Sequence, residues 1–172
     1  MTSRSGTLTT HSGFNFQVRP ARPDDEAALQ DFFRHVTPED LRFRFLSSVK
    51  EVGHDRLVAM TAVDQQQNES FLAFEHDGGP IIGTAMLACD DSLETGEVAV
   101  SISKDYKNRG IGWELLRHLT RRATAKGVKK LQSIENRANV SAIRLEGEMG
   151  FTSKPYPDSM LVLLERTLAP AA

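Results

Sequence analysis

Cysteine is nearly absent from this chain, and so are other signs of a protein held together by cross-links or metals. Cys89 is the one cysteine among 172 residues, which excludes an internal disulfide. No group of cysteines and histidines has the spacing of a structural zinc site. The first fifteen residues contain no apolar run long enough for a signal peptide or a membrane span. We therefore expect a cytoplasmic protein that uses no metal and does not enter a membrane.

An excess of charge of either sign is also lacking. Lysine and arginine number 21 against 23 aspartates and glutamates, which gives a formal net charge of -2. This balance provides no general attraction for nucleic acid or for an anionic membrane, so any basic site must be local. The length and the 40% hydrophobic content fit one domain with a sizeable core. We expect a flexible tail over residues 1–15 and a single domain over residues 16–168.

The order of the expected elements defines the fold class. Strands that come first and then alternate with helices predict an α/β (α+β) fold, with a mixed central sheet covered by helices on both faces. Hydrophobic alternation, helix-start signals and turn residues predict strands at 16–19, 70–75, 81–89, 97–103, 129–135 and 159–166, and helices that begin at Pro23 and Pro38 or cover 54–62, 112–126 and 139–148. The turn Asp77-Gly78-Gly79-Pro80 predicts an antiparallel hairpin.

A loop with two glycines in the second half of the chain carries the clearest functional signal. Gly110 and Gly112 open a helix, whose first backbone N–H groups are unpaired and lie at the positive end of the helix dipole. Such a helix start binds anions, and Lys107 and Arg109 add charge suited to a diphosphate. Leu115 stands where a dinucleotide-binding fingerprint has its third glycine, and the loop is not a P-loop. The alternative role for the glycines is close packing of the helix on the strand.

Two motifs lie on either side of the expected 129–135 strand. The first reads Lys107-Asn108-Arg109-Gly110-Ile111-Gly112, and the second reads Asn139-Val140-Ser141-Ala142-Ile143-Arg144-Leu145 followed by Gly150-Phe151. They resemble the Gln/Arg-x-x-Gly-x-Gly/Ala and Asn-x-x-Ala-Ile-x-Leu motifs of the GNAT superfamily of acyl-CoA-dependent N-acetyltransferases. The resemblance covers residues 16 to 168. It implies the GNAT fold, with a mixed and mostly antiparallel central sheet flanked by helices, and acetyl-CoA as the co-substrate.

Three further segments, 18–26, 42–45 and 96–100, are similar to the acetyltransferase domain of bacterial protein lysine acetyltransferases. This resemblance implies that Glu97 is the general base and that the backbone of Ile102 binds the pantetheine arm. It also implies that Lys107, Asn108, Arg109, Gly110, Ile111 and Gly112 wrap the diphosphate and that Asn139 reaches the pantetheine or the acyl group. The alternatives are a solvated strand-edge carboxylate for Glu97 and a helix cap for Asn139.

Two positions depart from the family pattern. Lys107 stands where the family has glutamine or arginine, which keeps the charge but loses the forked geometry of a guanidinium. Many GNAT enzymes have a tyrosine seven residues after the asparagine as general acid to the leaving thiolate, and here that residue is Glu146. The protein-lysine subgroup also lacks the tyrosine, so the resemblance leaves the acid unassigned. Cys89, within an apolar strand, is expected to be buried and inert.

These features predict an enzyme that transfers an acetyl group from acetyl-CoA to a primary amine by direct attack. A lysine amine, with a pKa of about 10.4, is mostly protonated at neutral pH, so a base is needed. The leading acceptor is a protein lysine, and the alternative is a small amine such as a polyamine, an amino sugar or an amino acid. A rival from another class is a non-catalytic module that senses acyl-CoA. We expect a monomer or homodimer that binds neither nucleic acid nor membrane.

Overall fold

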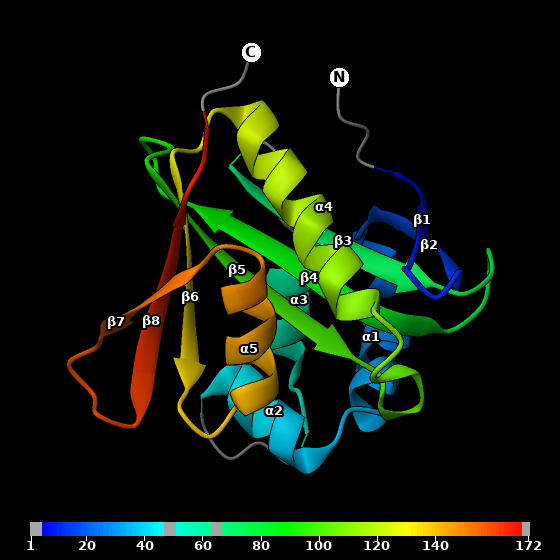
Figure 1. Cartoon of the computed structure of the whole chain (residues 1–172). Coiled ribbons are helices and arrows are strands. Elements are labelled where there is room, and N and C mark those ends of the chain that lie inside the picture. Colours follow the sequence, from blue (N-terminus) through cyan, green and yellow to red (C-terminus); the bar gives the residue numbers. More distant parts are fainter. Residues whose placement is uncertain (1–4, 47–50, 63–66, 170–172) are drawn as a thin grey trace.

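The structure, a computed structural model, describes residues 5–46, 51–62 and 67–169. An eight-stranded sheet in the order β1-β2-β3-β4-β5-β6-β8-β7 runs through these residues (Figure 1). Neighbouring strands are antiparallel except for β5 and β6, which are parallel, so the expected mixed and mostly antiparallel sheet is confirmed. The strands are β1 (Gly6–Thr9), β2 (Asn15–Pro20), β3 (Asn68–Phe74), β4 (Ile81–Cys89), β5 (Thr95–Ile102), β6 (Lys130–Asn136), β7 (Thr152–Pro155) and β8 (Leu161–Thr167).

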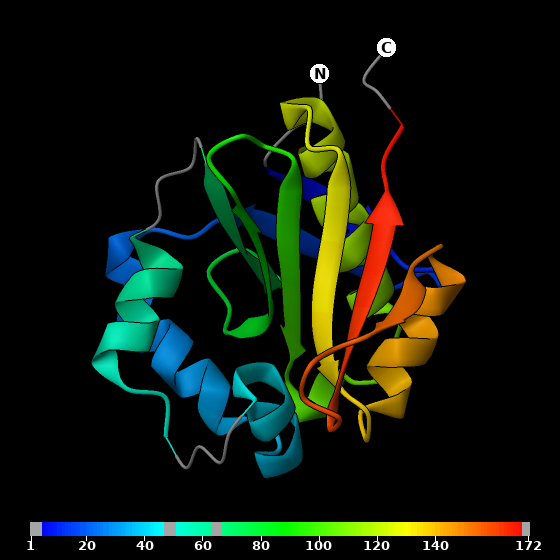
Figure 2. The ribbon, with the colours of Figure 1, turned by 90° about the vertical axis from the view of Figure 1, so that its left-hand side faces the viewer.

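Helices cover both faces of the sheet (Figure 2). One face carries α1 (Glu26–Arg34), α2 (Pro38–Phe45) and α3 (His54–Thr61), and the other carries α4 (Ile111–Lys126) and α5 (Val140–Glu148). Single 3₁₀ turns, η1 (Pro23–Asp25) and η2 (Lys104–Tyr106), precede α1 and α4. Within the described ranges, no helix combines the length and apolar character needed to cross a bilayer.

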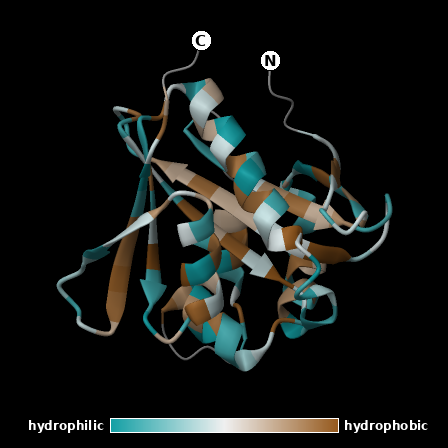
Figure 3. Cartoon of the chain, in the orientation of Figure 1, coloured by the Kyte–Doolittle hydropathy of each residue, from teal (hydrophilic) through white to brown (hydrophobic). Residues whose placement is uncertain are grey.

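Each face of the sheet has its own hydrophobic core. The core under α4 and α5 includes Phe16, Phe71, Leu115, Leu119, Leu131 and Leu164, all of them fully buried. The core under α1, α2 and α3 includes Leu29, Phe32, Leu57 and Leu72. In Figure 3 the strand β8 is brown, whereas teal and white residues alternate on the outward face of α4. This separation of apolar and polar faces explains why the helices pack on the sheet as they do.

Local sequence fixes where the helices that border the site begin and end. The Thr37 hydroxyl accepts a 3.1 Å hydrogen bond from the Asp40 N–H, and Pro38 takes the first helical position of α2. The helix α4 lies between Gly110, with φ of 86°, and Gly127, with φ of 84°. Because this left-handed conformation favours glycine, these two residues set the ends of α4.

The start of the chain differs from the sequence-based expectation. Residues 1–4 lie outside the described residues, but Gly6–Thr9 form β1 and pair with β2. Leu8 packs against the core, Thr10 is buried, and Gly13 turns the chain with φ of 90°. The expectation of a flexible tail is therefore wrong for this part, because alternating threonines form a strand there despite their polar composition. The exposed edge strand β7 is a second strand that the sequence patterns do not predict.

The sheet opens between β5 and β6. Their parallel pairing runs from Thr95 opposite Lys130 to Glu97 opposite Gln132 and ends there. Beyond this point β5 continues to Ile102 along β4, while β6 continues along β8. The two strands diverge, and in the described part of the chain no strand pairs with the edge of β5 that faces this gap. The gap positions the candidate site.

Candidate functional site

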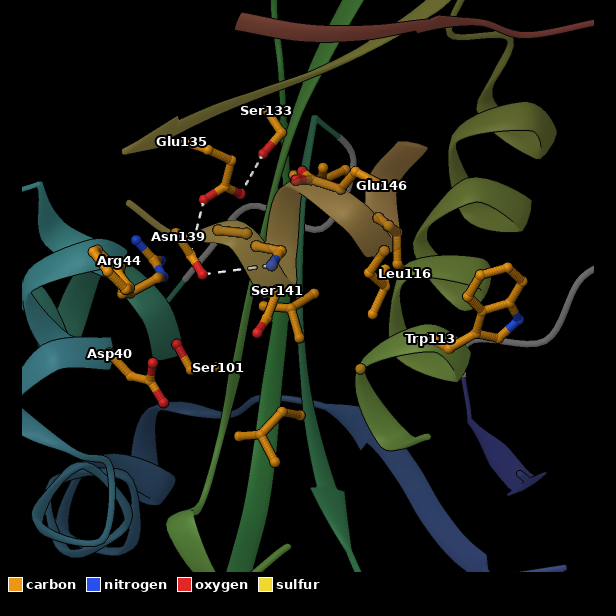
Figure 4. A pocket seen from close by; sticks show the side chains of 18 of the residues that line it. Asp40, Arg44, Ser101, Trp113, Leu116, Ser133, Glu135, Asn139, Ser141 and Glu146 are labelled. Atoms are coloured by element: carbon orange, nitrogen blue, oxygen red, sulfur yellow. Dashed lines mark hydrogen bonds between the residues drawn. The ribbon is translucent and has the colours of Figure 1, made fainter. Parts of the chain in front are cut away.

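A cavity of about 370 Å³ occupies the gap between β5 and β6. Its walls come from α2, β5, the loop before α4, the start of α4, β6 and α5 (Figure 4). The fold brings to it every site residue predicted from the sequence except Arg109. Those that line it are Glu97, Ile102, Lys107, Asn108, Gly110, Ile111, Gly112 and Asn139.

The loop before α4 has the backbone geometry of an anion site. Asn108 and Gly110 are both left-handed, with φ of 63° and 86°, so the loop curls around the start of α4. The first N–H groups of that helix have no carbonyl one turn earlier with which to bond. They lie at the positive end of the helix dipole, and this end of α4 lines the cavity. A Cβ on Gly110 would lie 3.3 Å from the Cβ of Thr10, so both the left-handed backbone and the close packing favour glycine here.

The two basic side chains of the loop have different surroundings. The Lys107 Nζ lies 2.6 Å from the Oδ2 of Asp40, across the cavity mouth on α2. The Arg109 guanidinium stacks 4.8 Å above the ring centre of Tyr106 and 5.7 Å from that of Phe14. Arg109 therefore stands beside the cavity rather than in its lining. Sequence reasoning missed Asp40, because only the fold places α2 beside this loop.

Glu97 marks the point where β5 and β6 part. Its side chain is exposed and lines the cavity. Arg44 on α2 is the neighbouring cation: burial lowers the pKa of Arg44, and the charges of Glu97 and Glu135 raise it. The Nε of Arg44 is buried without a hydrogen-bond partner among the described residues. Arg44 thus brings a positive charge near two carboxylates, which its sequence position does not reveal.

Asn139 caps the last helix, as one of the two alternatives predicts. Its Oδ1 accepts a 3.4 Å hydrogen bond from the Ala142 N–H, and its Nδ2 donates to the Glu135 Oε2 at 3.2 Å. The same side chain lines the cavity, so capping does not remove it from the site. Contact with a pantetheine or acyl group stays a prediction.

A pair of carboxyl groups, Glu135 on β6 and Glu146 on α5, lies on the α5 side of the cavity (Figure 4). The Ser133 hydroxyl donates to the Glu135 Oε1 at 2.8 Å. Burial raises the pKa of both carboxyl groups, and burial together with the charge of Glu135 raises the pKa of Glu146 to about 8. The Glu146 Oε2 and the Ser101 Oγ are buried without a hydrogen-bond partner in the described part of the chain. From the sequence, Glu146 is visible only as a departure from a family pattern.

Other reactive groups lie apart from this cavity. Cys89 is buried in β4, as expected, and burial raises the pKa of its thiol. A buried neutral thiol is a weak nucleophile. Over residues 5–46, 51–62 and 67–169, no three His, Cys, Asp or Glu side chains are grouped so as to hold a metal ion.

Comparison with known proteins shows which family this chain belongs to and which solved structures share its fold. The sequence model of the Acetyltransferase (GNAT) family matches residues 29–151. Acetyltransferase PA5475 of Pseudomonas aeruginosa is 29% identical over 156 residues, which cover 90% of this chain and 84% of that protein. The GNAT domain of S. lividans PAT has a TM-score of 0.88 at 23% identity, covering 95% of this chain and 97% of that one. YncA of Salmonella typhimurium, solved with its cofactor acetyl-CoA, has a TM-score of 0.71 at 20% identity, covering 90% and 94%.

Proposed function

Because the chain belongs to the GNAT family of acetyltransferases, we propose that it transfers an acetyl group from acetyl-CoA to a primary amine. The gap between β5 and β6 carries the proposal. It joins an anion-binding loop at one end to Glu97 at the other, along a strand edge that no other strand pairs with in the described residues. The match to the family model confirms the resemblance seen in the sequence motifs at the level of the family.

The residues of the cavity fit the parts of acetyl-CoA. The N–H groups at the start of α4 and the ammonium of Lys107 bind the diphosphate, and Lys107 exchanges Asp40 for phosphate oxygens. The free edge of β5 from Val98 to Ile102 offers backbone groups to the amides of the pantetheine arm. Five strand residues span about 16 Å, which carries an arm that starts at the loop to the level of Glu97. The unpartnered Ser101 Oγ supports a polar ligand in the cavity.

Glu97 acts as the general base in this proposal. It removes a proton from the acceptor amine, directly or through water, and the nitrogen then attacks the thioester carbonyl. A backbone N–H on the free edge of β5 polarises the carbonyl oxygen. Arg44 places a positive charge near Glu97 and Glu135; burial raises the pKa of Glu135, and the charge of Arg44 opposes that rise. Transfer is direct, because the thiol of Cys89 is buried and neutral.

A protein lysine is the acceptor that we propose. Three large apolar side chains are exposed on segments that border the cavity or adjoin its lining: Leu46 at 42%, Val140 at 67% and Met160 at 62%. Leu46 lines the cavity itself, Val140 follows Asn139, and the Met160 carbonyl accepts a hydrogen bond from the Arg137 N–H. An apolar rim suits a macromolecular partner better than a small and highly charged amine. It also agrees with the sequence similarity to protein lysine acetyltransferase domains.

A screen of CoA release tests the proposal. The purified chain is supplied with acetyl-CoA and, in separate reactions, with lysine-bearing proteins, polyamines, amino sugars and amino acids, and free thiol is measured. We expect thiol release with at least one protein, together with a new acetyl-lysine in its mass spectrum. Release with a small amine alone would make that amine the acceptor. Calorimetric binding of acetyl-CoA without thiol release from any amine would show a sensing module instead.

A further inference from the structure

We propose that Glu146 is the acid that protonates the leaving thiolate of CoA, and that Glu135 is the positioning residue that holds the proton on Glu146. The inference rests on the acetyl transfer proposed above. It assigns a proton donor to a reaction for which the sequence offers only a glutamate at the tyrosine position of other family members.

Glu146 and Glu97 line the same cavity, and the β6 residues beside Glu146 in that lining lie just beyond the residue paired with Glu97. Gln132 is the β6 residue paired with Glu97, and Ser133 is the next residue of that strand. Ser133, Glu135 and Glu146 line the same cavity, where the Ser133 hydroxyl donates to the Glu135 Oε1 at 2.8 Å and the charge of Glu135 acts on Glu146. Glu146 therefore shares the cavity with a stretch of β6 that begins one strand residue, about 3.3 Å, beyond the level at which Glu97 leaves the sheet.

The two carboxyl groups reach this level from opposite faces of the sheet. Paired strand residues point to the same face and successive residues to opposite faces, so Ser133 and Glu135 point away from the face of Glu97. The neighbour of Glu97, Val98, packs in the core under α4, which places Glu97 on the α2 face. A thioester held in the gap thus presents its carbonyl to an amine on the Glu97 side and its sulfur to Glu146 on the α5 side.

Glu146 keeps its proton at neutral pH. It is 4% exposed, and burial with the charge of Glu135 raises its pKa to about 8. Burial raises the pKa of Glu135 too, but hydrogen bonds from Ser133 and Asn139 and the charge of Arg44 oppose that rise, whereas on Glu146 the charge of Glu135 adds to burial; we therefore assign the proton to Glu146. Around the pair, Ser133 and Asn139 are neutral, and the charge of Arg44 acts on Glu135. On the α4 side the cavity is lined by the uncharged Trp113 and Leu116.

Glu97 first takes the proton of the ammonium form and passes it to water, so the amine is neutral when it attacks. The transfer step then moves one further proton from nitrogen to sulfur. The amine nitrogen forms a bond to the acetyl carbon, the carbon–sulfur bond breaks, and the sulfur leaves with the electron pair. The Glu146 carboxyl gives its proton to this sulfur and becomes a carboxylate, while Glu97 accepts the proton that the nitrogen loses. Water in the open cavity returns a proton to Glu146 and removes one from Glu97 before the next turnover. Atoms and charges balance without any further reactant.

The protonation of Glu146 is tested first, independently of any acceptor. Carbon NMR of protein labelled at the glutamate side-chain carboxyls follows each titration in wild type, Glu146→Gln and Glu148→Gln. Glu148 is the matched control, because it is exposed on the same helix and the change is the same. We expect one carboxyl that titrates near pH 8 in wild type and in Glu148→Gln, and its loss in Glu146→Gln. If every glutamate titrates in the ordinary range near 4.3, the proposal is overturned.

Turnover then tests the role of that proton, with an acceptor that wild type acetylates. We expect Glu146→Gln to lower kcat about tenfold to a hundredfold, near the low end for a general acid because a thiolate leaves readily. Acetyl-CoA affinity should hold. In wild type kcat should fall above about pH 8, where Glu146 loses its proton, and this fall should vanish in Glu146→Gln.

A third variant separates positioning from catalysis. Glu135→Gln removes the charge that raises the pKa of Glu146, so the fall in kcat should remain but move to lower pH. A Glu146→Gln enzyme with the kcat and high-pH fall of wild type would overturn the assignment of Glu146. Wild type that acetylates no amine would instead overturn the proposed function, so the two failures are distinguishable.

Discussion

Replacing Gly110 with alanine is expected to weaken acetyl-CoA binding beyond what its loss of stability explains, and Gly127→Ala supplies the control. The two glycines lie at opposite ends of α4, with φ of 86° and 84°. Either alanine has a side chain in the left-handed region, which costs about 1–2 kcal/mol of unfolding free energy. For a chain of this size that lowers Tm by about 2–8 °C. The backbone penalty is therefore matched, and only the surroundings differ.

Those surroundings predict different effects on the ligand. A Cβ at Gly127 meets nothing within 4 Å, whereas at Gly110 it would lie 3.3 Å from the Cβ of Thr10, so the loop must shift by a few tenths of an ångström. A hydrogen bond from this loop to a charged phosphate contributes about 1.5–3 kcal/mol. The loss of one such bond weakens binding about tenfold to a hundredfold, because each 1.4 kcal/mol corresponds to about a factor of ten.

Isothermal calorimetry with acetyl-CoA, together with thermal unfolding of both variants, measures these effects. Gly127→Ala should bind like wild type at a temperature where it remains folded, and Gly110→Ala should bind at least tenfold more weakly. Equal acetyl-CoA affinity of the two variants would refute the assignment of this loop to the diphosphate. A larger loss of stability in Gly110→Ala is expected from the Thr10 contact and does not alter that comparison.

Two further predictions concern charge and nucleophilicity. Asp40→Asn removes a negative charge beside the loop proposed to bind the diphosphate, and it frees Lys107. Acetyl-CoA affinity should therefore rise about threefold to tenfold at low salt and by less at high salt. The control is Glu39→Gln, which changes an exposed neighbour in the same way. Weaker binding in Asp40→Asn would mean that Asp40 is needed to hold Lys107 in place. Cys89→Ala should keep the kcat of wild type, because a buried neutral thiol takes no part in direct transfer; an acetylated Cys89 in the mass spectrum of a trapped reaction, with loss of turnover in the variant, would contradict this.

Much of the fold follows from residues that act locally. Asp77 to Pro80 predict the β3–β4 hairpin, Thr37 and Pro38 predict the start of α2, and Gly127 predicts the end of α4, each within a residue or two. The exceptions are short edge strands. β1 and β7 are four residues each and largely exposed, so they lack the hydrophobic alternation by which longer strands are found.

The candidate site is predictable only where motif and backbone coincide. The loop from Lys107 to Gly112 can be predicted from the sequence alone, because the backbone at the start of a helix that could bind an anion explains its glycines locally. The sequence does not predict the Asp40–Lys107 ion pair or the Glu135–Glu146 carboxyl pair, because the partners lie on different elements and meet only when the sheet forms. Burial of Glu146 is likewise a property of the fold, and it turns an apparent departure from the family pattern into a candidate acid.

The kcat of Glu97→Gln tests the proposed chemistry most directly. The amide keeps the shape of the side chain but cannot accept the proton, so kcat should fall by about two to four powers of ten while acetyl-CoA affinity holds. The exposed Glu94, which lies outside the cavity lining, provides the control variant Glu94→Gln, which should keep the kcat of wild type. The loss should shrink as pH rises, because more of the acceptor amine is then already neutral. If Glu97→Gln turns over like wild type at neutral pH, Glu97 is only a carboxylate at the edge of a strand and the proposed mechanism is wrong.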